Sequence, residues 1–371
     1  MNFEFSDELL QLRDQARRFL TDQCPPSVPR RILETPEPYA ADLWRAIGEM
    51  GWTGAAIPEE YGGAGLGRLA VCVLAEELGR AVAPVPFSSS VYLATEALLL
   101  FGSEQQKQTW LPKLAAGEVI GTFAMAERPG SADPANLKAT AAGGLTGSKL
   151  AVPDGDIAGI AVVAVNGGSD AWLHLVDLTA PGVTRETVTT FDPTRSHARI
   201  AFAKAPAEPL PGSTNADSIR TLLDHAAVPM AFEQVGGAQA ALDMANAYAK
   251  ERYAFGRPIG SFQGIKHKLA DMYIQVELAR SNAYYGAWAV HTGAAELPIA
   301  AAVARIAACE AGWFVTKENI QTHGGMGFTW QMDCHLYYRR AKLLSLALGG
   351  AREWKHRLVN ELRARNDLAA A

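Results

Sequence analysis

The sequence is poor in cysteine, and its four cysteines lie too far apart to suggest a shared site. Cys24, Cys72, Cys309 and Cys334 show no CxxC spacing. The pattern therefore predicts neither a disulfide framework nor a zinc site. We expect reduced thiols, as in the cytoplasm, and no bound metal.

A basic excess and a long apolar run are also missing. The net charge of -5 gives no attraction for nucleic acid or for an anionic membrane surface. The first eight residues are acidic and lack the basic and apolar regions of a signal peptide. No apolar run is long enough to span a bilayer. We expect a cytoplasmic protein whose partners are proteins and small molecules, not nucleic acid or membrane.

The composition is that of a folded protein, with 49% hydrophobic and 20% charged residues. At 371 residues the chain exceeds what one hydrophobic core usually spans, which favours two or three subdomains. No internal repeat or low-complexity segment interrupts it.

The order of patterns along the chain is helical, then β, then helical. Apolar residues recur near a 3.6 period from Asp7 to Leu20, behind a capping candidate at Ser6. From Gly121 short runs rich in Val and Ile alternate with Gly and Pro. We predict an N-terminal helical domain at 1–120, a middle β domain at 121–213 and a C-terminal helical domain at 214–371. The predicted helices are 7–20, 43–50, 69–78, 91–101, 104–114, 217–252, 261–292, 296–320, 333–346 and 350–366, and the clearest strands are 160–165 and 172–177.

Four motifs in one order carry a family resemblance. Glu251-Arg-Tyr-Ala-Phe-Gly-Arg-Pro-Ile-Gly-Ser-Phe-Gln263 resembles the acyl-CoA dehydrogenase signature, in which an arginine precedes Phe-Gly and a Phe-Gln pair follows. Pro58-Glu-Glu-Tyr-Gly-Gly63 and Ala75-Glu-Glu-Leu-Gly79 are similar to the family's N-terminal domain. Gln321-Thr-His-Gly-Gly-Met-Gly-Phe-Thr329 is similar to its C-terminal glycine loop. The resemblance covers nearly the whole chain.

The resemblance implies an α+β fold made of an N-terminal helical domain, a middle β-barrel domain and a C-terminal four-helix bundle. It also implies FAD bound at a subunit interface, with the isoalloxazine in one subunit and the adenylate half reaching its neighbour. The implied reaction removes an α-proton and a β-hydride from an acyl-CoA thioester, and electron-transfer flavoprotein is the implied acceptor.

The residues that resemble the family's adenylate-binding set are present. The resemblance makes Arg252 a phosphate contact and places Phe255, Gln263, Gln321, Gly324 and Gly325 beside the cofactor. Each residue also has a purely structural interpretation. Arg252 could be a solvated helix residue, Gln263 an ordinary helix start, and the glycines a helix end.

The residues that resemble the flavin-binding set are altered. Ala126-Glu-Arg-Pro-Gly-Ser-Ala-Asp133 stands where the family commonly has Thr-Glu-Pro-Gly-Ala-Gly-Ser-Asp, so Ala126 and Ala132 replace two hydroxyl side chains. Ala151-Val-Pro153 stands where the family typically has Trp-Ile-Thr, and Pro153 has no N–H. The alternatives are an alignment shifted by a residue or two, or contacts made by backbone alone.

The residue at the usual position of the catalytic glutamate is Leu348, which cannot accept a proton. A minority of the family places the base near the start of the helix leading into the Arg-x-x-Phe-Gly motif, and counting back reaches Ala226. The nearby titratable residues are Asp224, His225 and Glu233. Each of these could instead be an exposed or structurally paired residue, so the catalytic base stays unassigned.

These losses suggest three hypotheses. In the first, the chain is one subunit of a heteromeric acyl-CoA dehydrogenase, for instance a heterotetramer, acting in fatty-acid or steroid side-chain degradation. It completes the FAD site of a homologous subunit that carries the flavin groove and the base. In the second, it is a self-sufficient homo-oligomeric FAD enzyme with a displaced base. In the third, it is a non-catalytic scaffold.

Overall fold

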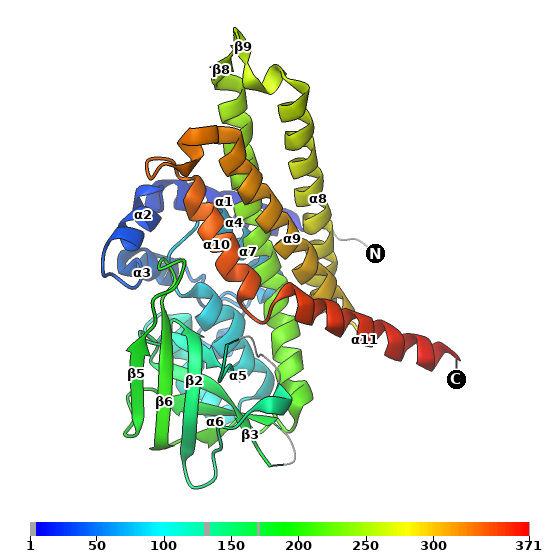
Figure 1. Cartoon of the computed structure of the whole chain (residues 1–371). Helices are drawn as coiled ribbons and strands as arrows, with labels where there is room; N and C mark the ends of the chain where they lie inside the picture. Colours follow the sequence, from blue (N-terminus) through cyan, green and yellow to red (C-terminus); the bar gives the residue numbers. More distant parts are fainter. Residues whose placement is uncertain (1–4, 130–133, 169–170, 371) are drawn as a thin grey trace. The chain divides into compact units, whose positions relative to one another are not determined.

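The computed structural model describes residues 5–129, 134–168 and 171–370 (Figure 1). Ala132, one of the two predicted hydroxyl losses, lies outside these residues. The chain divides into two compact units. Unit 1 comprises Met1–Arg30, Cys72–Ala83 and Ala227–Ala371, and unit 2 comprises Arg31–Val71 and Pro84–Ala226. The three-domain division at residues 120 and 213 stays a prediction.

Unit 1 is helical, and its helices follow the predicted periodicities within a few residues. Ser6 caps the first helix as expected, because its Oγ accepts a hydrogen bond from the Leu9 amide at 3.4 Å. The helices are α1 (Asp7–Gln23), α8 (Gln263–Thr292), α9 (Leu297–His323), α10 (Cys334–Leu346) and α11 (Ala351–Ala370), with the later parts of α4 (Gly67–Arg80) and α7 (Ala216–Glu251).

Two glycines set how closely α4 and α7 approach each other in unit 1. A Cβ atom at Gly79 would lie 1.9 Å from the Glu233 carbonyl oxygen, and one at Gly236 would lie 1.8 Å from the Glu76 carbonyl oxygen. No real Cβ tolerates such a distance, so the two backbones can touch only because both positions are glycine. This contact fixes the register of α4 against α7.

Helix α9 is the apolar centre of the unit 1 bundle. Ala300, Ala304 and Ala308 are fully or almost fully buried, and α7, α8 and α10 run alongside the helix (Figure 1). Among the described residues, Leu297–Phe328 is the one helical stretch long and apolar enough to cross a membrane. Because 61% of its most apolar 18-residue stretch is buried inside the protein, it has the character of a core helix.

Unit 2 combines short helices with two sheets. Its helices include α3 (Ala41–Glu49), η1 (Glu59–Tyr61), α5 (Glu96–Phe101) and α6 (Glu104–Ala115). The segment predicted as a helix at 91–101 begins as a π-helix, η2 (Ser88–Thr95), and continues as α5. Helix α2 (Ser27–Glu34), which begins in unit 1 and ends in unit 2, was not predicted.

The two sheets of unit 2 share no strand. The first has the order β1-β3-β4-β7 and the second the order β2-β6-β5. Strand β3 pairs parallel to β1 and antiparallel to β4, and its residues 160–165 are all buried. Such an unbroken apolar run is typical of a strand covered on both faces. The strands are β1 (Gly121–Ala124), β2 (Leu145–Pro153), β3 (Ile160–Asn166), β4 (Ala171–Asp177), β5 (Val183–Thr187), β6 (His197–Ala205) and β7 (Glu208–Pro209).

A small hairpin joins α7 to α8 in unit 1 and was not predicted. Its strands are β8 (Tyr253–Ala254) and β9 (Arg257–Pro258). The two residues between them, Phe255 and Gly256, have φ values of 53° and 79°. Positive φ at both central residues is the signature of the tight turn that matches the twist of a hairpin.

Candidate functional site

The hairpin end of unit 1 presents polar side chains without partners. Arg252 directly follows α7 and is exposed, and Gln263 begins α8 and is also exposed. Within the described part of the chain, neither side chain has a hydrogen bond or an ion pair. The Arg252 backbone is fixed, because its N–H donates to Tyr248 and its carbonyl accepts from Ile259, both at 2.8 Å. Phe255 is 95% exposed at the tip.

The end of α9 adds sterically accessible glycine backbone to this region. Gln321 is exposed and, among the residues described, its side chain has no partner. Gly324 has a φ of 59°, and a Cβ at Gly324 or Gly325 would meet nothing within 4 Å. A ligand could therefore approach the backbone of η5 (Gly324–Phe328) closely.

One aromatic contact joins these two segments. The rings of Tyr248 and His323 stack with centroids 4.1 Å apart, so the last turn of α9 lies against the last turn of α7. His323 is buried, and its Nδ1 lies 2.9 Å from the Asn319 carbonyl oxygen. Sequence reasoning missed His323, although its position before the two glycines is a signal. The predicted residues Arg252, Phe255, Gln263, Gln321, Gly324 and Gly325 thus belong to two adjoining segments of unit 1.

The chemistry of this end suits a phosphate-bearing ligand. An exposed guanidinium supplies a permanent charge and several donors, and two amide side chains add further hydrogen-bonding groups. The open glycine backbone removes the steric barrier to close contact. The adenylate half of FAD fits these residues, which we call the adenylate end: Arg252, Phe255, Gln263, Gln321, Gly324 and Gly325.

The loop after β1 in unit 2 uses its polar groups differently. Lys149 is fully buried, and its Nζ lies 2.7 Å from Glu127 Oε1 and 3.1 Å from the Met125 carbonyl oxygen. Glu127 also accepts from the backbone N–H groups of Lys138 and Ala139 at 2.7 and 2.9 Å. Burial opposes ionisation of Glu127, but the hydrogen bond and charge of Lys149 outweigh it and lower the pKa of Glu127. These bonds fix the loop internally.

At the predicted flavin positions that the structure describes, the side chains of Ala126, Ala151 and Pro153 offer no hydrogen-bond donor. Ala126 presents a methyl group, and its carbonyl already accepts from the Leu150 N–H at 2.7 Å. Ala151 has a φ of 50° and lies in a β-bulge between Lys149 and Val152. Pro153 accepts a hydrogen bond from Thr122 Oγ1 at 2.5 Å through its carbonyl. The isoalloxazine half of FAD therefore does not fit the side chains found here.

Leu348 lies in a turn that is anchored but contains no acid. Its φ is 60°, and its carbonyl accepts from Trp354 Nε1 at 3.1 Å. The preceding carbonyls of Leu344 and Ala347 accept from Arg305, which is fully buried and also donates to Gln234. Burial lowers the pKa of Arg305. Sequence reasoning missed Arg305, because its partners lie 39 to 71 residues away along the chain.

Of the candidates near the alternative base position, Asp224 and Glu233 are buried and His225 is partly buried. Ala226 itself is completely buried. In unit 1, Glu233 Oε1 lies 3.5 Å from Arg340 Nη1, with both side chains buried. In unit 2, Asp224 is buried, and His225 Nδ1 lies 2.7 Å from Glu96.

Glu96 is buried, and it forms a network with two partly buried partners that the sequence did not reveal. Arg68 Nε donates to Glu96 Oε1 at 2.7 Å, and His225 contacts the same oxygen. Burial opposes ionisation of Glu96, but the hydrogen bond from His225 and the charge of Arg68 outweigh it and lower its pKa. The only indication of this network in the sequence is one acidic residue, Glu96, at the start of the apolar run of α5.

Metal ligands do not gather in the described part of the chain. No group of three or more His, Cys, Asp or Glu residues is placed to hold an ion there. All four cysteines are buried and unpaired, and burial raises the pKa of Cys24 to about 12.

Comparison with known sequences places the chain among acyl-CoA dehydrogenases. Residues 6–118 match the model of the acyl-CoA dehydrogenase N-terminal domain, and residues 216–361 match that of the C-terminal domain. Acyl-CoA dehydrogenase IpdE2 of Mycobacterium tuberculosis is 35% identical over 359 residues, which cover 96% of this chain and 98% of that protein. Mitochondrial isovaleryl-CoA dehydrogenase of Solanum tuberosum is 30% identical over 93% of this chain and 88% of its own length.

Solved structures agree with the sequence comparison. The Tcur3481-Tcur3483 steroid ACAD has a TM-score of 0.89 and 34% identity, covering 98% of this chain and 99% of its own. The ChsE4-ChsE5 complex of Mycobacterium tuberculosis has a TM-score of 0.89 and 29% identity, with the same coverage. The predicted fold is confirmed. The chain belongs to the acyl-CoA dehydrogenase family, whose members are FAD-dependent oxidoreductases.

Proposed function

We propose that this chain is one subunit of a heteromeric acyl-CoA dehydrogenase and that it completes the FAD site of a homologous catalytic partner. The observation that carries the proposal is the unequal state of the two predicted half-sites. Among the residues that the structure describes, the guanidinium and two amides of the adenylate end have no partner, whereas the flavin positions hold Ala126, Ala151 and Pro153. Random decay would be expected to alter both halves alike.

The adenylate end supplies binding and orientation. Arg252 would hold the pyrophosphate, with Gln263 and Gln321 as polar contacts and Gly324 and Gly325 as the closely approached backbone. Phe255 would lie beside the same group. In the family the bound FAD supplies the hydride acceptor. No residue of this end removes a proton, so its contribution is affinity and position.

Proton abstraction is assigned to the partner. A base must lie within hydrogen-bond reach of the α-proton, and the side chain at the usual position is that of Leu348. The Arg305 and Trp354 contacts fix the backbone around Leu348 without supplying a carboxylate. The partner therefore provides the base, and the pair carries out α,β-dehydrogenation of an acyl-CoA thioester.

Exposed apolar side chains on α8 support assembly with another subunit. Tyr273, Ile274 and Leu278 are 56%, 51% and 55% exposed, and the last two lie one helical turn apart on one face. Large exposed apolar patches are typical of surfaces that bind another protein. A homologous subunit is the expected occupant.

The relatives suggest the substrate class. One similar structure is described as a steroid ACAD and another is a ChsE4-ChsE5 complex, so we assign this chain to fatty-acid or steroid side-chain degradation. Electron-transfer flavoprotein is the proposed acceptor.

The test is the visible spectrum and the FAD-to-chain ratio of the protein purified alone and after co-expression with a homologous subunit. We expect a colourless chain alone, and a yellow complex with one FAD for every two chains that is bleached by acyl-CoA. About one FAD per chain in the isolated protein, bleached by acyl-CoA, would contradict the proposal.

A second candidate is a self-sufficient enzyme with a displaced base, and one observation favours it. Glu96 fixes His225 through Nδ1, which leaves Nε2 as a possible proton acceptor one residue from Ala226. In that case His225→Gln would abolish bleaching of a flavin bound to the isolated chain while preserving its FAD content. If the isolated chain binds no FAD, this candidate is excluded.

A further inference from the structure

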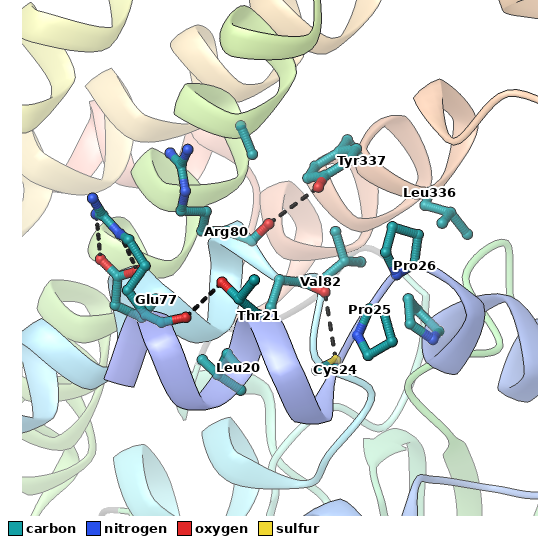
Figure 2. A pocket seen from close by; sticks show the side chains of 14 residues that line it. Leu20, Thr21, Cys24, Pro25, Pro26, Glu77, Arg80, Val82, Leu336 and Tyr337 are labelled. Carbon is teal, nitrogen blue, oxygen red and sulfur yellow. Dashed lines mark hydrogen bonds and ion pairs between the residues drawn. The ribbon is translucent and has the colours of Figure 1, made fainter. Parts of the chain in front are cut away.

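A cavity of about 310 Å³ opens in unit 1, away from the adenylate end (Figure 2). Its walls come from α1 and the proline-rich segment after it, from the end of α4, from α7 and from the start of α10. This volume lies at the lower end of the range for small-molecule sites, roughly 300 to 1,000 Å³. The cavity is lined by Arg17, Leu20, Thr21, Cys24, Pro25, Pro26, Pro29, Glu77, Arg80, Ala81, Val82, Ala240, Leu336 and Tyr337.

The cavity is a consequence of the close approach of α4 and α7. The glycine contacts at Gly79 and Gly236 bring the two backbones together one turn before Ala240. Ala240 is therefore held at the cavity wall with only a methyl group to fill the space. A larger side chain at this position would occupy the cavity without disturbing the glycine contact.

The two sides of the cavity differ in polarity. Glu77 and Arg80 lie at one side, whereas Pro25, Pro26 and Leu336 lie at the other (Figure 2). Such a lining suits a ligand with one polar end and one apolar end, because each end then meets groups of its own kind.

The polar side of the cavity lining contains two guanidinium groups and one carboxylate. Glu77 is buried and already accepts two hydrogen bonds from Arg17, at 2.9 and 2.7 Å. Burial raises the pKa of Cys24 and of Tyr337 to about 12, so neither adds a negative charge near neutral pH. Arg17 is thus paired inside the lining, whereas the partner of Arg80, Asp243, lies outside it, so Arg80 is the cation of the lining that an anionic ligand group can reach.

Arg80 is the cation best able to bind that group. Its Nη2 lies 2.6 Å from Asp243, which is not part of the lining, and this pair is partly exposed. An exposed pair contributes little and can be shared with an incoming carboxylate. The Arg80 backbone is held in place, because its carbonyl accepts from Tyr337 Oη at 3.1 Å.

Val82 gives an independent indication that the wall is adapted to a ligand. It has a φ of 48° although it is β-branched, which is an unfavourable combination. The Val82 and Ala83 N–H groups donate to Gly79 and Leu78, the pattern of a helix end that normally carries glycine at the Val82 position. A strained residue that presents an apolar side chain to a cavity is typical of binding sites.

We propose that this cavity binds a small amphipathic carboxylate, with the carboxylate at Arg80 and the apolar part against Pro25, Pro26 and Val82. The proposal is independent of the FAD-site proposal, because it rests on residues that do not belong to the adenylate end. Free acids related to the acyl group of the substrate have the required chemistry.

The test is calorimetric titration of the full chain with sodium octanoate, and with acetate and 1-octanol as probes that lack the apolar part or the charge. We expect saturable octanoate binding, and binding of the other two that is roughly ten- to a hundredfold weaker. The absence of saturable octanoate binding up to about 10 mM would overturn the proposal.

Two variants locate the binding. Ala240→Leu fills the cavity and should abolish octanoate binding, whereas Ala247→Leu, on an exposed position of the same helix, should not change it. Arg80→Gln should weaken octanoate binding roughly tenfold or more. Arg18→Gln, which removes an exposed charge of α1, should have no effect. Undiminished binding by folded Ala240→Leu would place octanoate elsewhere and overturn the proposal.

Discussion

The adenylate end of unit 1 and the β1 loop of unit 2 use their polar groups in opposite ways. At the adenylate end, the backbone is fixed while the Arg252, Gln263 and Gln321 side chains face solvent. In unit 2, the charged groups of Lys149 in β2 and of Glu127 after β1 turn inward and bond to each other and to nearby backbone. The first arrangement leaves groups ready for a ligand, and the second serves the fold.

The difference shows that scaffold and ligand contacts can change separately. The ion pair of Glu127 and Lys149 joins the residue after Ala126 to β2 through contacts that involve no flavin. Replacing a hydroxyl with a methyl group at Ala126 leaves that pair untouched, so loss of ligand contacts need not destabilise the unit. The fold of unit 2 therefore does not depend on a side-chain hydroxyl at position 126.

The largest expected effect on stability is at the ion pair of Lys149 and Glu127. Replacing Lys149 with Met leaves Glu127 without its charged partner, and the free energy of unfolding should fall by roughly 3 to 5 kcal/mol. Lys138→Met is the matched control, because that side chain is exposed and only its backbone N–H bonds to Glu127. Urea denaturation of both variants measures the difference. Equal stability would mean that the ion pair does not hold the loop.

The pH dependence of stability tests the structural role of Glu96 and its partners Arg68 and His225. The pKa of Glu96 in the folded protein is lowered below its unfolded value of about 4.3, so its stabilising effect is complete above that pH and is lost as pH falls through the folded pKa. Glu96→Gln should lose roughly 1.5 to 3 kcal/mol at neutral pH and show a shallower acid dependence. Denaturation midpoints between pH 3 and 7 test this, with exposed Glu118→Gln as control. Parallel pH profiles for wild type and Glu96→Gln would contradict it.

The smallest expected effect on stability is at Leu348, where the family usually has its catalytic glutamate. Leu348 has a φ of 60°, so Leu348→Gly should relieve strain and raise the free energy of unfolding by about 1 kcal/mol. Leu346→Gly, at the exposed last residue of α10, should instead lower it by roughly 0.5 to 1 kcal/mol. Thermal unfolding of the pair checks the opposite signs. Destabilisation by Leu348→Gly would show that its side-chain packing outweighs the backbone strain.

Local periodicity predicted most of the helices. The apolar spacing of α1, α8 and α10 locates each within three residues of its observed ends. The hairpin β8–β9 was missed because two-residue strands are too short to show a period of two. Helix α2 was missed for a related reason, since three prolines and two arginines within and before its eight residues hide its apolar spacing.

Sequence motifs named the candidate site residues but not their contacts. Sequence named the adenylate end and Leu348, but it could not show that the Arg252, Gln263 and Gln321 side chains lack partners. Nor could it show that Arg305 anchors the Leu348 turn, because that contact joins α9 to α10 across the bundle. Long-range contacts of this kind leave no spacing pattern in the chain.

The most direct test of the central claim is whether this chain binds FAD for another subunit. In a co-purified complex with a wild-type partner, Arg252→Ala in this chain should weaken FAD binding roughly ten- to a hundredfold without lowering its stability. Lys250→Ala, an exposed charge in the last turn of α7, should leave FAD binding unchanged. The FAD content of each complex, measured by absorbance after dilution, shows whether the variant has lost FAD affinity. Full FAD retention by the Arg252→Ala complex would contradict the account.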